Sequence, residues 1–184
     1  MSDLNLTAGA VFGQLATTFK VMRGKAKLDE AYIFSHNALW QAIFAGWILA
    51  TLSSALLVDL QNITPFIVTS LAALIAIVLF VILIIQIFGR VGRSARVLPF
   101  LVPFLWVSNF QIVFVGMLLG LILITQATVL QIPALAILIW SMIWLFRIAR
   151  RQADVSGWWA VGLLLMQMAV DASVRLLANS MAAL

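Results

Sequence analysis

Residues 66–88 read FIVTSLAALIAIVLFVILIIQIF and contain no charged side chain. A helix crosses the hydrocarbon core of a bilayer, which is about 30 Å thick, with roughly 20 apolar residues. Because lipid cannot hydrogen-bond the backbone, such a segment must satisfy its own amides and carbonyls, and a helix does so. This run therefore predicts a membrane-spanning helix.

Four further apolar runs of similar length lie at residues 38–58, 100–124, 129–146 and 158–178. Apolar residues make up 65% of the 184-residue chain and charged residues 9%, against roughly 45–50% and about 25% in soluble domains. A soluble protein of this size could not bury so much apolar surface. We therefore expect an all-α fold, an integral membrane bundle of five transmembrane helices over residues 31–184, preceded by an interfacial segment at residues 1–30.

Basic residues mark one side of the predicted membrane. All but one of the 11 lysines and arginines fall in three clusters, before the first span, after the second and after the fourth. Positive charge favours cytoplasmic loops, so the pattern predicts a cytoplasmic amino terminus and an outer carboxyl terminus. Since the clusters do not line a soluble surface, nucleic acid is not an expected partner. Contact with anionic lipid head groups is expected at Lys20, Arg23, Lys25, Lys27, Arg90, Arg93, Arg147, Arg150 and Arg151.

The first 30 residues contain an amphipathic pattern. Thr7 stands where a helix N-cap is expected, and one helical face carries Val11, Phe12, Leu15, Phe19 and Met22. Such a helix either lies in the cytoplasmic interface, with its lysines toward lipid phosphates, or packs under the bundle as a lid. Both arrangements can hold together, and the sequence favours neither.

Small residues at helical spacing predict close helix contacts. Ala42, Gly46 and Ala50 recur every four residues in the first span, and Gly116 and Gly120 form a GxxxG pair in the third. Small residues let transmembrane helices approach closely. The pattern fits either a dimer interface or packing of the first span on the third within one chain. We favour packing within the chain, because a five-helix bundle needs internal contacts.

The fifth span carries polar residues every four positions, which are Gln167, Asp171, Arg175 and Asn179. At about 1.5 Å per residue, Asp171 lies roughly 20 Å from Trp158 and is still within the hydrocarbon. A lone charge there costs about 2.5–3.5 kcal/mol, so we expect Asp171 and Arg175 to pair at their i,i+4 spacing. The polar face is either a structural clasp to neighbouring spans, which we favour, or a polar path opening to the outer side.

Residues suited to catalysis or metal binding are scarce. The chain has no cysteine, which rules out thiolate chemistry. Its single histidine, His36, makes a poor metal site by itself. No nucleophile and base stand at a useful spacing. We therefore expect no enzymatic activity, no cofactor and no metal.

Three stretches resemble the Yip (Ypt-interacting protein) membrane family in its bacterial branch. They are residues 19–30 leading into the first span, residues 87–93 (IFGRVGR) and residues 155–159 (VSGWW). Eukaryotic members act with small GTPases in vesicle traffic through an Asp-Leu-Tyr-Gly-Pro type of motif, which is absent here, so the resemblance implies no GTPase-binding residue.

The resemblance implies a small protein of the bacterial inner membrane with a cytoplasmic start and five spans. Together with the residues above, it leads us to expect a scaffold or partner-binding protein without enzymatic activity. Its partners would be membrane lipids and either a second membrane protein or another copy of the chain. The alternative is a small transporter or channel that uses the polar face of the fifth span.

Overall fold

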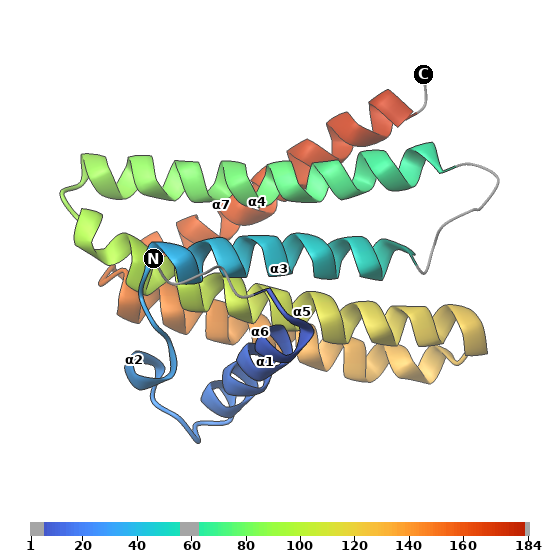
Figure 1. Ribbon diagram of the computed structural model, residues 1–184, viewed down its shortest axis with the longest axis horizontal. Coiled ribbons are helices and arrows are strands. Elements are labelled where there is room, and N and C mark those ends of the chain that lie inside the picture. The colour runs from blue at the N-terminus through green and yellow to red at the C-terminus, as the bar shows by residue number, and fades with distance from the viewer. Residues whose placement is uncertain (1–5, 56–62, 183–184) are drawn as a thin grey trace.

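The structure, a computed structural model, describes residues 6–55 and 63–182. Within them every regular element is helical, and five helices are long and apolar enough to cross a membrane. These are α3 (His36–Ala55), α4 (Thr64–Arg90), α5 (Val97–Thr125), α6 (Gln131–Gln152) and α7 (Gly157–Ala182). The prediction of an all-α bundle with five transmembrane helices is confirmed (Figure 1).

Short helices complete the described chain. Helices α1 (Ala8–Met22) and α2 (Leu28–Ala31) precede the bundle, and the 3₁₀ turns η1 (Ser94–Arg96) and η2 (Thr128–Leu130) lead into α5 and α6. The end of the first predicted span and most of the turn predicted after it, at residues 56–62, lie outside the described residues.

Most boundaries agree with the sequence to within a few residues, but α6 is longer than predicted. We expected the fourth span to end at residue 146, whereas α6 continues to Gln152 and carries Arg147, Arg150 and Arg151 on its last turns. The physical reason is that arginine marks where the hydrocarbon ends and not where a helix ends. Arginine is a good helix former, and positive charge is favourable at a helix carboxyl terminus.

The five long helices form a ring that is closed at one end only, because α7 begins beside the end of α6 and then runs away from it past α4 (Figure 1). Helix α3 packs between α4 and α5, α5 packs on α6, α6 contacts α7, and α7 returns to α4. Figure 1 shows α4 and α7 crossing on one side of α3, with α5 and α6 on the other. A ring of five helices leaves an interior that side chains must fill.

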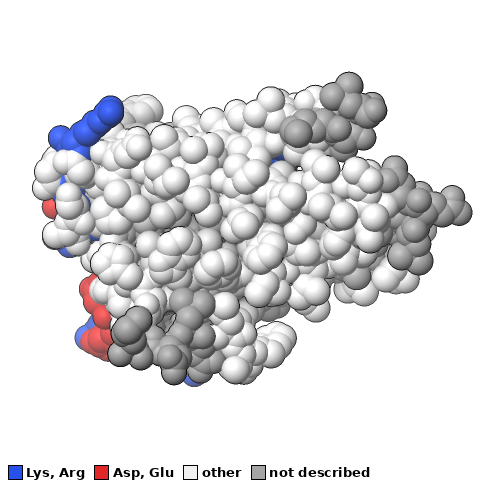
Figure 2. All heavy atoms as spheres, turned by 45° about the horizontal axis from the view of Figure 1, so that its top comes forward, with Lys and Arg blue, Asp and Glu red and all other residues white. Residues whose placement is uncertain are grey.

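One end of the ring, which we call the basic end, gathers the charged residues. It contains the carboxyl ends of α4 and α6 and the turns that follow them. Figure 2 shows the charged side chains at and near this end, while the long flank is almost entirely white. The interior of this half is filled by a column of phenylalanines in contact: Phe88 stacks on Phe100 at 5.5 Å, Phe100 meets Phe104 at 4.9 Å with tilted rings, and Phe104 stacks on Phe80 at 5.3 Å between ring centroids.

Helix α1 packs against the flank of α5. The Thr7 hydroxyl accepts a hydrogen bond from the amide of Ala10, which confirms the predicted N-cap. Leu15 and Met22 are buried, and the Phe19 ring stacks on Phe110 with centroids 5.9 Å apart. Phe12 is 68% exposed, so α1 both packs on the bundle and offers an apolar side chain to lipid.

The turns at the basic end are fastened to one another. The Arg93 guanidinium donates hydrogen bonds to the backbone carbonyls of Ala153 and Asp154, which joins the turn after α4 to the turn after α6. The buried Gln152 amide donates to an Asp29 carboxylate oxygen at 2.7 Å and so ties α2 to the end of α6. The first contact fixes the two turns relative to each other, and the second fixes α2 relative to the ring.

Candidate functional site

A half-open cavity of about 270 Å³ lies between α4, α5, α6 and α7, and its wall includes the exposed side chains of Leu138 and Met168. Its floor, toward the basic end, includes Phe80, Leu105 and Leu145. Because Phe80 also stacks on Phe104, the phenylalanine column separates the cavity from the basic end. The polar side chains of the wall are Ser108, Asn109, Gln111, Gln167 and Asp171.

The α5 wall comes from residues 108–111, Ser-Asn-Phe-Gln, which interrupt an otherwise apolar helix. Ser108 and Gln111 are three residues apart and therefore share a helix face. Asn109 sits at the border with α3 and is 2% exposed. Its side-chain amide donates to the backbone carbonyl of Ala42 at 2.9 Å. The Asn109 side chain is thus held in place at the edge of the cavity.

The small residues of α3 make room for this arrangement. A Cβ atom on Gly46 would lie 2.5 Å from Asn109 Oδ1, and one on Gly116 would lie 2.7 Å from Ser53 Oγ. Ala42 and Gly120 are buried and Ala50 is half-buried. In this structure Gly46 and Gly116 therefore serve close contacts between α3 and α5 of one chain.

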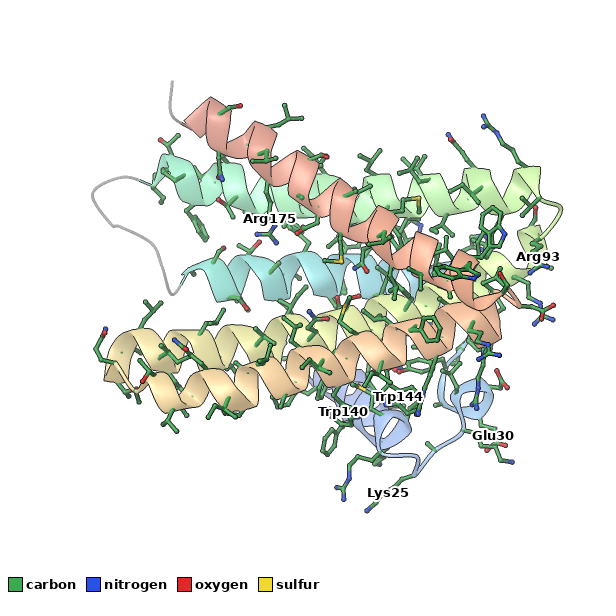
Figure 3. The ribbon with its side chains drawn as sticks, turned by 180° about the vertical axis from the view of Figure 1, so that it is seen from behind. Lys25, Glu30, Arg93, Trp140, Trp144 and Arg175 are labelled. Atoms are coloured by element: carbon green, nitrogen blue, oxygen red, sulfur yellow. The ribbon has the colours of Figure 1, made fainter. Side chains whose placement is uncertain are left out.

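The α7 wall comes from the polar face that the sequence singles out. Gln167 and Asp171 line the cavity, and the Gln167 amide approaches Ser108 Oγ of α5 at 3.5 Å. Arg175 Nε lies 2.8 Å from Asp171 Oδ2, and Figure 3 shows Arg175 projecting from α7 toward the inner side of the bundle. Asn179, one turn farther from the basic end, is exposed and is not part of the wall.

The Asp171–Arg175 pair is only partly buried. The side chains are 47% and 57% exposed, with Asp171 the less exposed. Both residues belong to α7, so this ion pair stabilises one helix and does not join α7 to a neighbour. It also cancels charge locally, which lowers the cost of placing ionised groups at this depth.

The cavity wall is mostly apolar and carries a small group of polar side chains on α5 and α7. The cavity volume is near the lower end of the range for ligand pockets, and the cavity has room for several water molecules. One carboxylate stands among hydroxyl and amide groups that can both donate and accept hydrogen bonds. Such a wall suits a small cation, or a neutral or cationic molecule of a few heavy atoms.

The residues on α4 and α6 that were expected to contact lipid head groups lie at the basic end, whereas Figure 3 shows Lys25, in the turn after α1, beyond the flank of the bundle and away from that end. Lys20, Lys25, Arg90, Arg150 and Arg151 are exposed. The guanidinium groups of Arg23 and Arg147 lie over the rings of Phe19 and Trp144, at 5.4 Å and 5.3 Å from the centroids. Lys27 Nζ pairs with Glu30 at 3.1 Å, and Arg93 is half-buried because it binds the turn carbonyls.

Sequence reasoning missed part of the site. Ser108 and Gln111 were not singled out, although two hydroxyl or amide side chains beside Asn109 in an apolar helix were a usable signal. The contact between Asp29 and Gln152 joins residues far apart in the chain and left no local signal. Within the described residues no group of three His, Cys, Asp or Glu side chains stands close enough to hold a metal ion.

No family model matches the chain, and neither curated proteins nor solved structures gave a match. The resemblance to the Yip family therefore stays a prediction, and the function is inferred from the chemistry of the site.

Proposed function

We propose that this membrane protein binds a small cation in the cavity lined by α5 and α7 and acts as a small transporter or channel. The observation that carries the proposal is the Asp171 carboxylate, which lines a cavity together with Ser108, Gln111 and Gln167. An ionisable residue inside a transmembrane segment is costly and is usually retained for a function. The proposal requires binding and passage of a molecule but no change in its covalent bonds.

The competing hypothesis, a scaffold in which the polar face is a structural clasp, has weaker support. A clasp needs strong contacts between helices, yet the ion pair lies within α7. The one contact from this face to α5, between Gln167 and Ser108, is 3.5 Å long, which is at the weak limit of a hydrogen bond. The polar face of α7 therefore makes no strong contact with a neighbouring helix, and a ligand at Asp171 would share its carboxylate with Arg175.

The membrane orientation is part of the proposal. The basic residues support placing the basic end in the cytoplasm, and the resemblance to the bacterial Yip branch supports a bacterial inner membrane. In that orientation the phenylalanine column separates the cavity from the cytoplasm, and Arg175 lies on the outer side of Asp171. A transport cycle would then require the column to open, by movement of α4 against α5.

The test measures whether a cation stabilises the purified protein through Asp171. Thermal unfolding in mild detergent is followed with sodium, ammonium, methylammonium and ethylammonium chlorides, against N-methylglucamine chloride at equal ionic strength. A ligand at 100 times its Kd stabilises the folded state by about 2.7 kcal/mol. For a chain of this size that corresponds to a rise in Tm of roughly 5–10 °C.

Two matched variants decide the interpretation. D171N removes the carboxylate, so the rise in Tm is expected to disappear. R175Q removes the ion pair but keeps the carboxylate, so the rise is expected to remain. If no cation raises the Tm of the wild-type protein, or if D171N keeps the full rise, the proposed function is wrong.

A further inference from the structure

A second cavity, of about 430 Å³, lies at the basic end, away from the site described above. It is bounded by the end of α1, the segment leading into α2, the turn η1 and the last turns of α6. We call it the basic pocket. Its cationic side chains are Lys27, Arg96, Arg147 and Arg151.

The positive charges of the basic pocket are not balanced by its acidic residue. Asp29 is the carboxylate in the wall, and one of its oxygens accepts a hydrogen bond from Gln152. Lys27 pairs with Glu30. Neither ion pair found among the described residues includes Arg96, Arg147 or Arg151. Three guanidinium groups thus share one pocket without a carboxylate partner.

This arrangement is unfavourable for the protein alone. Arg147 and Arg151 stand four residues apart on α6, and like charges at that spacing repel. Arg96 is the N-cap residue of α5, where the helix dipole is positive and a cation is disfavoured. The dipole at the carboxyl end of α6 favours Arg151 but cannot account for Arg96. A bound anion would remove these costs together.

The rest of the wall indicates the kind of anion. Beside the arginines the basic pocket is lined by apolar and aromatic side chains, among them Val21, Ile148 and Trp144. Figure 3 shows Trp144 and Trp140 on the side of α6 toward α1, and Trp140 lies seven residues, or about 10 Å along α6, from Arg147. The surface thus passes from guanidinium groups to aromatic rings over the depth that separates head group from acyl chain.

We propose that the basic pocket holds the phosphate of an anionic phospholipid. Guanidinium groups of Arg96, Arg147 and Arg151 donate hydrogen bonds to the phosphate oxygens, because their planar fork matches this group. The acyl chains then extend from the pocket along the Trp144 side of α6. This inference is independent of the ligand site between α5 and α7.

The test uses the full-length chain in mild detergent and measures binding of phosphatidylglycerol and phosphatidylcholine by native mass spectrometry and by the rise in Tm. The variant R96Q/R151Q removes two charges from the basic pocket and leaves the contact between Arg147 and Trp144 intact. Because the variant loses charge-assisted hydrogen bonds to the phosphate, we expect its affinity for phosphatidylglycerol to fall by about 30-fold or more, with phosphatidylcholine binding unchanged.

The control variant R90Q/R150Q removes the same charge from exposed arginines of the basic end that do not line the pocket. It should weaken phosphatidylglycerol binding by less than threefold. An equal loss in both variants would show general surface attraction and would overturn the proposal. Equal stabilisation of the wild-type protein by inorganic phosphate, lost in R96Q/R151Q, would show a free-anion site and would overturn the lipid assignment.

Folding of the variants is checked separately. R96K/R151K keeps both charges but loses the planar fork, and we expect it to fold like the wild-type protein and to bind phosphatidylglycerol with intermediate affinity. If R96Q/R151Q cannot be purified in a folded state, the affinity of R96K/R151K for phosphatidylglycerol tests the proposal in its place. Affinity equal to that of the wild-type protein would contradict a role for the guanidinium groups.

Discussion

Replacing Gly46 by alanine should destabilise the protein through a single contact. The added Cβ atom would lie 2.5 Å from Asn109 Oδ1, about 0.9 Å inside the 3.4 Å at which ordinary contact begins. Asn109 cannot give way freely, because it is buried and its amide is bonded to the Ala42 carbonyl. Relief therefore requires either separation of α3 from α5 or loss of that hydrogen bond.

The expected loss of stability follows from these two ways of relieving the clash. Hydrogen bonds between transmembrane helices contribute about 0.6 kcal/mol on average and up to about 1.7 kcal/mol, and overpacking a tight contact costs about 1–3 kcal/mol. We expect G46A to lower the free energy of unfolding by about 2 kcal/mol. The assay is unfolding in mixed micelles of mild detergent and SDS, followed by tryptophan fluorescence.

A double-mutant cycle isolates the contact. N109A removes the obstructing oxygen, so G46A should cost little more when it is added to N109A. The matched control is G162A on α7, where a Cβ atom would meet nothing within 4 Å; it should be neutral or slightly stabilising. The reasoning is refuted if G46A behaves like G162A, or if its cost is the same with and without Asn109.

Three further predictions concern charges and hydrogen bonds elsewhere in the chain. D171L should lower the free energy of unfolding by about 1–2 kcal/mol more than D171L/R175L does, because the single change leaves a cation without its partner in the membrane; equal thermal melts in detergent would contradict the pairing. R93A should lower the free energy of unfolding by about 1–2 kcal/mol, because it loses the hydrogen bonds to Ala153 and Asp154, whereas R90A should change it by close to zero. Similar unfolding curves for the two variants would contradict the stabilising role of these bonds. Burial raises the pKa of Tyr32 from 10.0 to about 12, although its bond to Thr18 acts to lower the pKa. Because the folded state favours the neutral phenol, its stabilisation is complete below pH 10 and is lost as the pH rises toward 12, so the free energy of unfolding of the wild-type protein should fall by up to about 3 kcal/mol more than that of Y32F over this range. Parallel pH profiles of the two proteins would contradict this prediction.

The sequence predicted the elements of the fold because each span is a continuous apolar run, which is a local property. It also predicted the spacing that pairs Asp171 with Arg175, since i,i+4 neighbours on a helix are fixed by the helix itself. Apart from the packing of the first span on the third, which the small residues favoured, it did not predict the order of the helices in the ring. That order depends on which side chains fit against each other, as at Gly46 and Asn109.

Only the α7 half of the candidate site could be predicted, because the other half depends on how the helices pack. The α7 wall was visible as a repeating polar face, whereas the α5 wall becomes part of a site only when α5 faces α7 across the ring. Arg93 illustrates the limit at the basic end. Its position in a basic turn predicted contact with lipid, but only the three-dimensional structure brings the carbonyls of Ala153 and Asp154 within reach of its guanidinium.

Cysteine labelling tests the hydrated cavity most directly, because the natural chain has no cysteine and gives no background. In proteoliposomes, S108C places a thiol on the cavity wall, whereas L79C places one on the exposed outer side of α4, at a similar distance from the basic end. Thiolates form and react only where water reaches them. We predict that a small cationic thiosulfonate labels S108C and leaves L79C unmodified; S108C as unreactive as L79C would contradict a polar ligand site inside the ring.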